Sequence, residues 1–175
     1  MDMPALRSFG KNETYILFRA WKLGINSPYS SSAGRLFDAV ASILGLRQRL
    51  DYDGQAAMMV EDLYSPDIKD AYPFRVSNGV IDWGPVFTAM LGDREKEKIP
   101  SRFINTLAEI VLMAARTAGL KDVCLSGGVF QNNPLTTRVI ELLSPEFNVF
   151  THRKVPPNDG CIALGQAVAG GMKRL

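Results

Sequence analysis

The feature that most constrains the fold is a short apolar run that breaks at paired glycines and resumes as a helix. Val123-Cys124-Leu125 predicts a buried strand, Gly127-Gly128 permits backbone conformations denied to residues with a Cβ, and Asn133 and Pro134 read as N-cap and first helical residue. Backbone N–H groups and the positive end of the helix would then face a phosphate or a nucleotide. A tight connection without a ligand is the alternative.

The segments around this junction predict an α/β fold. Apolar residues recur at helical spacing from Ser101 to a stop at Gly119, a further helix is expected over 134–143, a second strand over 147–151, and a small-residue helix suited to close packing over 162–169. The order helix, strand, glycine loop, helix, strand, helix is typical of α/β proteins.

Residues before this region predict mainly helices. Helical patterns cover 13–23, 36–44 after a cap at 30–32, and 54–64, and Asn78-Gly79 predicts a two-residue hairpin turn between strands at 74–77 and 80–83. Pro85 opens another short helix. The charge run at 93–98 is read as a solvated loop or helix end.

Composition bounds the class of protein. With 175 residues, 46% hydrophobic and 22% charged, the chain suits one globular domain, residues 1–175. A net charge of +2 gives no broad electrostatic footprint for nucleic acid or for an anionic membrane. Apolar runs are too short to span a bilayer and no signal peptide is recognised, so we expect a cytoplasmic protein. Cys124 and Cys161, with one histidine in the chain, predict reduced thiols.

Four segments together resemble the carboxy-terminal part of the HypF carbamoyltransferases. They are residues 26–28 with 31–40, residues 52–57, residues 125–132 with Gly-Gly-Val-Phe-Gln-Asn, and Val155-Pro156-Pro157-Asn158-Asp159-Gly160. The resemblance runs from about Asn12 to the end. It implies the second lobe of an actin/sugar-kinase/Hsp70-like (ribonuclease H-like) fold with extra helices, similar to the tRNA threonylcarbamoyltransferases.

The resemblance also implies an activity. Proteins of this family mature [NiFe] hydrogenases: another domain makes carbamoyl-adenylate from carbamoyl phosphate and ATP, and the matching domain transfers the carbamoyl group to the carboxy-terminal cysteine of a HypE partner. The cofactors implied are ATP or carbamoyl-adenylate and a divalent metal, whether iron, zinc or magnesium.

Six residues match the family's binding motifs. Gly34 and Asp38 match its nucleotide contacts, Gly127, Gly128 and Asn132 lie in its glycine loop, and Asp159 matches a metal-binding Asp. Asp38 lies one helical turn after Gly34, where a carboxylate can accept hydrogen bonds from ribose hydroxyls. An exposed helix residue for Asp38, a helix cap for Asn132 and a turn for Asp159 are the alternatives, and no catalytic residue is assigned.

Several family features have no counterpart in the sequence. The paired metal-binding histidines and the first lobe are not found, and His152 is read as a solvated residue at a strand end. We therefore expect a partial module that lacks full activity alone and is completed by the other lobe or by a homodimer. A non-catalytic nucleotide-binding or interaction module is the alternative, and a sugar-kinase-like phosphotransferase fits least.

Overall fold

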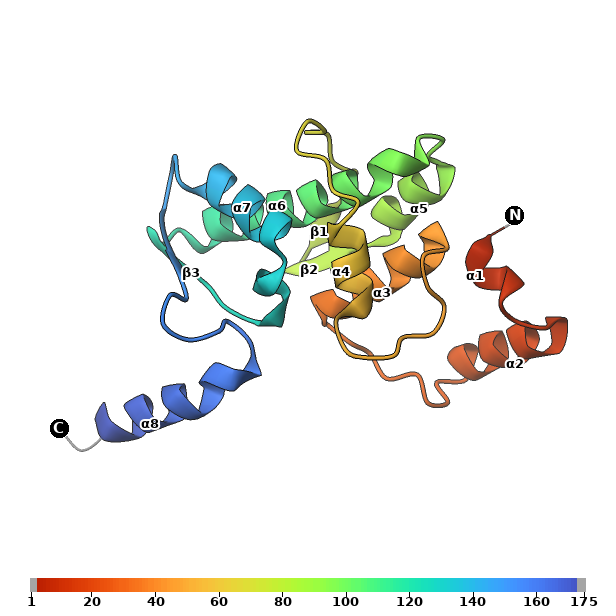
Figure 1. Cartoon of the computed structure of the whole chain (residues 1–175), viewed down its shortest axis with the longest axis horizontal. Coiled ribbons are helices and arrows are strands. Elements are labelled where there is room, and N and C mark those ends of the chain that lie inside the picture. Colours follow the sequence, from red (N-terminus) through yellow and green to blue (C-terminus); the bar gives the residue numbers. More distant parts are fainter. Residues whose placement is uncertain (1–2, 173–175) are drawn as a thin grey trace. The chain divides into compact units, whose positions relative to one another are not determined.

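The structure is a computed structural model that describes residues 3–172, and its internal contacts divide the chain into two units, Met1–Leu63 and Tyr64–Leu175. Figure 1 traces the elements of both units along the chain. Each unit has buried apolar side chains of its own.

The first unit is helical. It contains α1 (Pro4–Arg7), α2 (Lys11–Lys22), α3 (Ala33–Leu44) and α4 (Gln55–Glu61). The helices predicted over 13–23, 36–44 and 54–64 are confirmed as α2, α3 and a shorter α4, whereas α1 was not predicted. Phe37 and Val40 of α3 and Val60 of α4 are fully buried where these two helices pack together.

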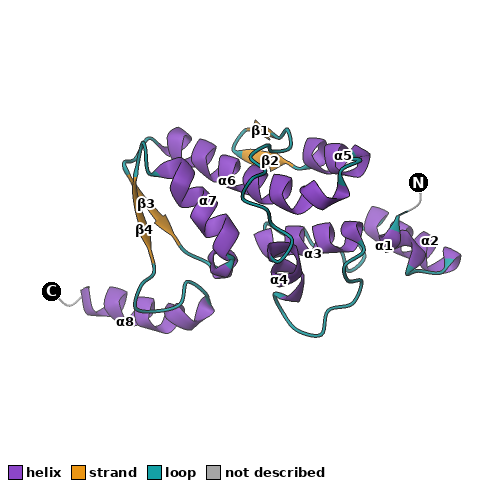
Figure 2. Cartoon of the chain, turned by 45° about the horizontal axis from the view of Figure 1, so that its top comes forward, coloured by secondary structure: helices purple, strands orange, loops and turns teal. Residues whose placement is uncertain are grey.

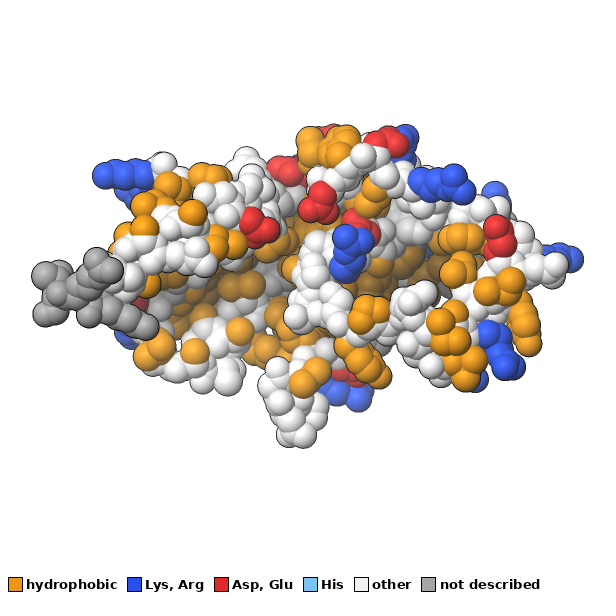
Figure 3. Space-filling model, turned by 90° about the horizontal axis from the view of Figure 1, so that it is seen from below, with side chains coloured by type: hydrophobic (Ala, Val, Ile, Leu, Met, Phe, Trp, Pro, Cys, Tyr) orange, Lys and Arg blue, Asp and Glu red, His pale blue; other side chains and the backbone are white. Residues whose placement is uncertain are grey.

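Helix α2 adds no residue to this core. Its apolar side chains, Tyr15, Ile16, Leu17, Phe18 and Trp21, are about half exposed or more. Figure 3 shows hydrophobic side chains gathered on the surface at the α1–α2 end of that view. The helix therefore depends on local features such as the hydrogen bond from Gly10 N–H to the Glu13 carboxylate, 2.7 Å.

The second unit begins with the predicted hairpin. Strands β1 (Arg75–Ser77) and β2 (Val80–Asp82) pair antiparallel, and Asn78 and Gly79 both have positive φ, 51° and 76°. Positive φ at both central residues is the requirement of the type I′ turn that Asn-Gly favours. Helix α5 (Gly84–Gly92), with Pro85 in its first turn, and the 3₁₀ turn η1 (Lys96–Lys98) follow.

Helix α6 (Ile99–Ala118) is the centre of this unit. Phe103, Ile104 and Ala108 are fully buried, and the helix packs along α7 (Asn133–Leu143) (Figure 1). The predicted start at Ser101 is wrong, because α6 begins at Ile99 with Pro100 in its first turn. Ser101 is buried instead, and its hydroxyl accepts a hydrogen bond from Ser65 N–H at 2.8 Å.

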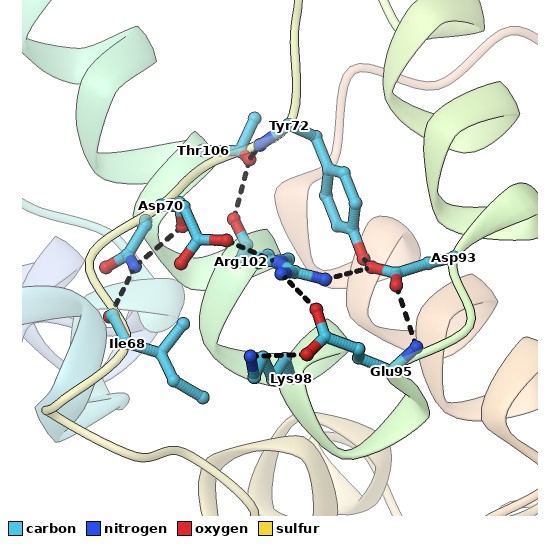
Figure 4. Close-up of polar contacts among 9 residues, drawn as sticks. Ile68, Asp70, Tyr72, Asp93, Glu95, Lys98, Arg102 and Thr106 are labelled. Carbon is cyan, nitrogen blue, oxygen red and sulfur yellow. Dashed lines mark hydrogen bonds and ion pairs between the residues drawn. The ribbon is translucent and has the colours of Figure 1, made fainter.

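Buried polar side chains of α6 hold the irregular segment 64–72. Asn105 Nδ2 donates to the carbonyls of Ile68 and Asp70 at 2.8 and 3.0 Å, and Thr106 Oγ1 accepts from Tyr72 N–H at 2.8 Å (Figure 4). These bonds satisfy backbone groups that belong to no helix or strand. They explain polar residues on a face where apolar periodicity alone would place a core.

The predicted order of strand, glycine loop, helix and strand is confirmed, and the structure shows that it forms a βαβ unit. Strand β3 (Asp122–Leu125) and strand β4 (Asn148–Thr151) pair parallel, from Asp122↔Asn148 to Leu125↔Thr151, and α7 connects them (Figure 2). The expectation that β3 is buried is wrong for most of the strand: Leu125 is buried, but Cys124 is exposed. Within residues 3–172 this sheet has two strands, and of their eight residues Leu125 alone is buried.

The last described helix, α8 (Ile162–Met172), corrects a further expectation. Its small residues predicted close packing, but every residue of the helix is exposed, including the apolar Ile162, Leu164 and Val168. Small side chains permit close approach, whereas burial requires a neighbouring surface. Neither α8 nor any other helix in residues 3–172 is long and apolar enough to span a membrane.

Candidate functional site

The candidate site is built where the two parallel strands end. Leu125 and Thr151 are the last paired residues of β3 and β4, so Ser126 and His152 follow them at the same edge of the sheet. Ligands of open α/β sheets bind outside the carboxyl ends of the strands, because loops and helix N-termini converge there. The glycine loop begins at this edge.

Gly127 determines the backbone conformation at the start of that loop. Its φ of 110° and ψ of 152° lie in a region open in practice to glycine alone. Its N–H donates to Pro157 O at 2.7 Å, and a Cβ placed on Gly128 would lie 3.8 Å from Asn158 Cβ. The glycine loop and the 156–160 segment are therefore neighbours, and the Gly127 N–H is already engaged within the protein.

The chain after the glycines forms the 3₁₀ turn η2 (Gly128–Gln131) and then α7. The predicted cap at Asn133 is wrong, because Asn132 is the N-cap and its Oδ1 accepts from Leu135 N–H at 3.0 Å. Asn132 is only 5% exposed. The side-chain oxygen of Asn132 therefore caps helix α7, as the alternative to ligand binding expected.

Asp159 lies in a turn. It begins the 3₁₀ turn η3 (Asp159–Cys161), and the side chain of Asn158 accepts from Gly160 N–H at 3.0 Å, as in an Asx turn. Asp159 is exposed. In the described part of the chain no three His, Cys, Asp or Glu residues gather into a group that could hold a metal ion. One exposed carboxylate does not make a metal site, so the residues present do not fit the implied metal.

Gly34 and Asp38 belong to the first unit. Both lie in α3 at the predicted four-residue spacing, and the Asp38 carboxylate pairs with Arg35 Nη1 at 3.0 Å. The Asp38 side chain is 25% exposed, and the nearest non-neighbouring atom to a Cβ on Gly34 would be Ser32 Oγ, 3.5 Å away. The helix surface beside Gly34 is thus open, as a nucleoside contact requires.

A hydrogen-bonded pair at the strand ends was missed in the sequence. His152 Nε2 lies 3.0 Å from Ser126 Oγ, so His152 is not simply solvated. His152 also lines a hollow of about 210 Å³ beside the glycine loop, together with Leu125, Phe130, Gln131, Thr136, Ile140, Thr151 and Pro157. The signal was available, because residues that directly follow two adjacent parallel strands must lie near each other.

Comparisons with known proteins describe what the chain is similar to. The family model "Carbamoyltransferase, Kae1-like Domain, second subdomain" matches residues 2–166. The carbamoyltransferase HypF of Synechocystis is 35% identical over 161 residues, which cover 87% of this chain and 21% of the relative. The Rhodobacter capsulatus protein of the same name is 38% identical over 155 residues, 86% of this chain and 21% of the relative. The chain thus spans about a fifth of their length.

Two solved structures of HypF proteins are also similar to the chain. A full-length HypF in its phosphate- and nucleotide-bound form superposes with a TM-score of 0.87 at 35% identity, covering 95% of this chain and 24% of that one. The HypF of T. kodakarensis superposes with a TM-score of 0.80 at 29% identity, covering 98% and 24%. These matches confirm the α/β fold expected from the sequence.

Proposed function

Because the chain belongs to the HypF carbamoyltransferase family, matching its second Kae1-like subdomain over residues 2–166, we propose that it forms part of a carbamoyl-transfer site and binds the nucleotide portion of carbamoyl-adenylate. The observation that carries the proposal is the strand, glycine loop and helix at 122–143, in a chain that superposes on a HypF bound to phosphate and nucleotide. The chain covers a fraction of its relatives, so the transferase activity belongs to a larger assembly.

The glycine loop supplies the binding chemistry. The first N–H groups of η2 have no partner within that turn, and such groups attract phosphoryl oxygens, whereas the Leu135 N–H of α7 is taken by the Asn132 cap. Gly127 holds the loop open without a side chain. In this proposal Asn132 fixes the start of α7 through its cap. For the first unit we propose separately, from the family motif that it matches, that Asp38 accepts hydrogen bonds from ribose hydroxyls.

The reaction proposed is carbamoyl transfer to a thiol. The sulfur of a carboxy-terminal cysteine on a HypE-like partner attacks the carbamoyl carbon, a C–S bond forms, and the bond from that carbon to the phosphate oxygen breaks. AMP leaves and the thiol proton passes to solvent. This chain binds and orients the adenylate, and Asp159 takes no part in a metal-dependent step here because it has no fellow ligands in the described residues.

A second candidate is a nucleotide-binding or interaction module without catalysis. The observation that favours it is the solitary Asp159, together with an Asn132 oxygen already engaged as a cap. Binding of nucleotide with no transfer to a peptide ending in cysteine, even when the remaining domains of a HypF relative are supplied, would identify it.

The direct test is calorimetric titration of the chain with the methyl ester of AMP, a stable phosphodiester that stands in for the adenylate. We expect saturable binding that Asp38→Ala weakens and that EDTA leaves unchanged, because a lone carboxylate does not retain a metal. Asp67→Ala, which removes an exposed carboxylate elsewhere, is the matched control. Equal binding by the wild-type and Asp38→Ala chains would contradict the assignment of Asp38, and no binding at all would contradict the proposal.

A further inference from the structure

We propose that His152 is a positioning residue, which holds the Ser126 hydroxyl so that its hydrogen is donated to a phosphoryl oxygen of the bound adenylate. The inference rests on the proposed function and adds a residue pair to it. The 3.0 Å contact between His152 Nε2 and Ser126 Oγ is its first observation.

The pair is fixed by the sheet. Each member directly follows the last paired residue of its strand, Leu125 in β3 and Thr151 in β4, so the backbone register holds the two side chains level. Beyond Ser126, the Gly127 N–H is bound to Pro157 O at 2.7 Å. The Ser126 backbone is therefore held on both sides at the entry of the glycine loop, by β3 before it and by the Gly127 bond after it.

The Gly127 bond also changes which groups can meet a ligand. Besides this engaged N–H, the loop entry carries the first N–H groups of η2 and the Ser126 hydroxyl as further donors. A serine hydroxyl has one hydrogen to donate and two lone pairs that accept. It serves as a donor to phosphate only if its neighbour does not take that hydrogen.

Histidine can meet this condition. When the imidazole hydrogen is on Nε2, the ring donates to Ser126 Oγ and the serine hydrogen points elsewhere; when it is on Nδ1, Nε2 takes the serine hydrogen. The proposal requires the first arrangement in the bound state. His152 lines the hollow of about 210 Å³ beside the loop, and its partner Ser126 is exposed, so a ligand group can reach both residues.

A double-mutant cycle tests whether His152 acts through Ser126. Affinity for the AMP methyl ester is measured for wild type, His152→Ala, Ser126→Ala and the double variant. Each single change is expected to weaken binding roughly tenfold, as for one hydrogen bond to a charged group, and the double variant to bind no more weakly than Ser126→Ala alone. His152→Gln, whose side-chain amide can still donate to Ser126, is expected to restore most of the affinity.

The single histidine gives a second measurement. His152 is the only imidazole in the chain, so its ¹⁵N signals need no assignment by mutagenesis. In the ester complex we expect the Nε2–H form, and loss of this preference in Ser126→Ala. Arg153→Ala, which removes a neighbouring positive charge outside the pair, should leave the tautomer unchanged.

The outcomes separate the two proposals. Additive losses in the cycle, failure of His152→Gln to restore binding, or an Nδ1–H tautomer in the complex would each overturn the role of His152 while nucleotide binding stands. A wild-type chain that does not bind the ester would overturn nucleotide binding and, with it, this inference. Urea unfolding of each variant identifies any loss of affinity that comes from unfolding.

Discussion

Gly127 and Gly128 are adjacent in the sequence but make different demands on the backbone. Gly127 has φ 110° and ψ 152°, whereas the backbone at Gly128 is that of a 3₁₀ turn and a Cβ there would meet only an ordinary contact, 3.8 Å from Asn158 Cβ. A side chain is therefore excluded at the first position by conformation and tolerated at the second.

We expect Gly127→Ala to lower the free energy of unfolding by about 1–3 kcal/mol, because the alanine must adopt a backbone conformation it strongly disfavours. Gly128→Ala is the matched control, with an expected change within about 0.5 kcal/mol. Urea unfolding followed by circular dichroism measures both. Equal stability of the two variants would contradict the assignment of strain to Gly127.

The Asn132 cap gives a prediction that separates stability from binding. Asn132→Ala removes the acceptor for Leu135 N–H and should lower the free energy of unfolding by about 1 kcal/mol. Asn132→Asp keeps an acceptor and should lower it much less. If the Asp variant is as unstable as the Ala variant, the cap does not stabilise α7. The two unfolding midpoints in urea, measured side by side, decide this.

At this scale the sequence predicted the kind of loop but not its detailed contacts. Paired glycines between an apolar run and a helix were enough to predict the loop. The cap fell on Asn132 rather than Asn133 because a 3₁₀ turn intervenes before α7, and either asparagine has the chemistry of a cap. The Ser126–His152 contact joins residues 26 positions apart, so it could be inferred only by pairing the two predicted strands in parallel, a step that no local pattern supplies.

Among the elements, α6 is held to its surroundings by a charged network centred on Arg102 (Figure 4). The guanidinium contacts Asp70, Asp93 and Glu95 at 2.6, 2.6 and 2.8 Å, and the Tyr72 hydroxyl donates to Asp93 at 2.7 Å. The charge run at 93–98 was read as solvated, which is wrong for Asp93, whose side chain is 9% exposed. Sequence alone shows a charge run but not the arginine that binds it.

This network lowers the pKa of each of its three carboxyl groups. The hydrogen bond from Arg102 lowers the pKa of Asp70, and hydrogen bonds from Lys98 and Arg102 lower the pKa of Glu95. Burial on its own raises the pKa of Asp93, but the hydrogen bonds from Tyr72 and Arg102 outweigh it, so that pKa is lowered too.

Carboxylates with lowered pKa values stabilise the folded state above the pKa of the unfolded chain, which is about 4, and lose that contribution as the pH falls through the folded values. We therefore expect the free energy of unfolding to fall as the pH drops below about 5. Arg102→Met should lower the free energy of unfolding by about 1–3 kcal/mol at neutral pH. Most of this loss should come from the buried contact to Asp93, because exposed ion pairs contribute little.

The pH profile supplies the control. Urea midpoints measured across this range should show a weaker acid loss in Arg102→Met than in wild type. Asp67→Asn, an exposed carboxylate in the same segment but outside the network, should leave the profile unchanged. An unaltered acid loss in Arg102→Met would show that other carboxylates cause it.

Helices were predicted more successfully than their burial. The periodicity of α3 and α6 identified both helices, because an apolar stripe that recurs every three to four residues has one common explanation. The pattern of α8 also gave a helix, but its composition suggested packing that the structure does not have. The composition of a helix indicates which surfaces it could pack against, but packing also requires a neighbouring element in contact with it.

For the whole molecule, the division at Tyr64 was not visible in the sequence, which has no obvious linker there. The larger unit contains α6, α7 and most of the buried apolar residues, while the smaller one buries Phe37, Val40, Ala41, Ala56 and Val60. Because a small core supplies little stability, the two units should differ in their capacity to fold alone.

We expect a fragment of residues 64–175 to fold with a cooperative urea transition and the far-ultraviolet dichroism of a mixed helix and strand protein. The fragment 1–63 is the matched comparison, and its transition should be broad or missing because so few side chains are buried. A non-cooperative transition in fragment 64–175 would contradict the view that its core is sufficient.

The parallel pairing of β3 with β4 has a consequence for the order in which the protein folds. Its partners, such as Asp122 and Asn148, are 26 residues apart, so the entropy lost on closing the loop is modest and α7 can form within it. We expect Val139→Ala in α7 to slow refolding more than it speeds unfolding in stopped-flow mixing, a high φ-value, and the opposite pattern would refute early formation. The strand ends that carry Ser126 and His152 would then be assembled before the rest of the molecule is complete.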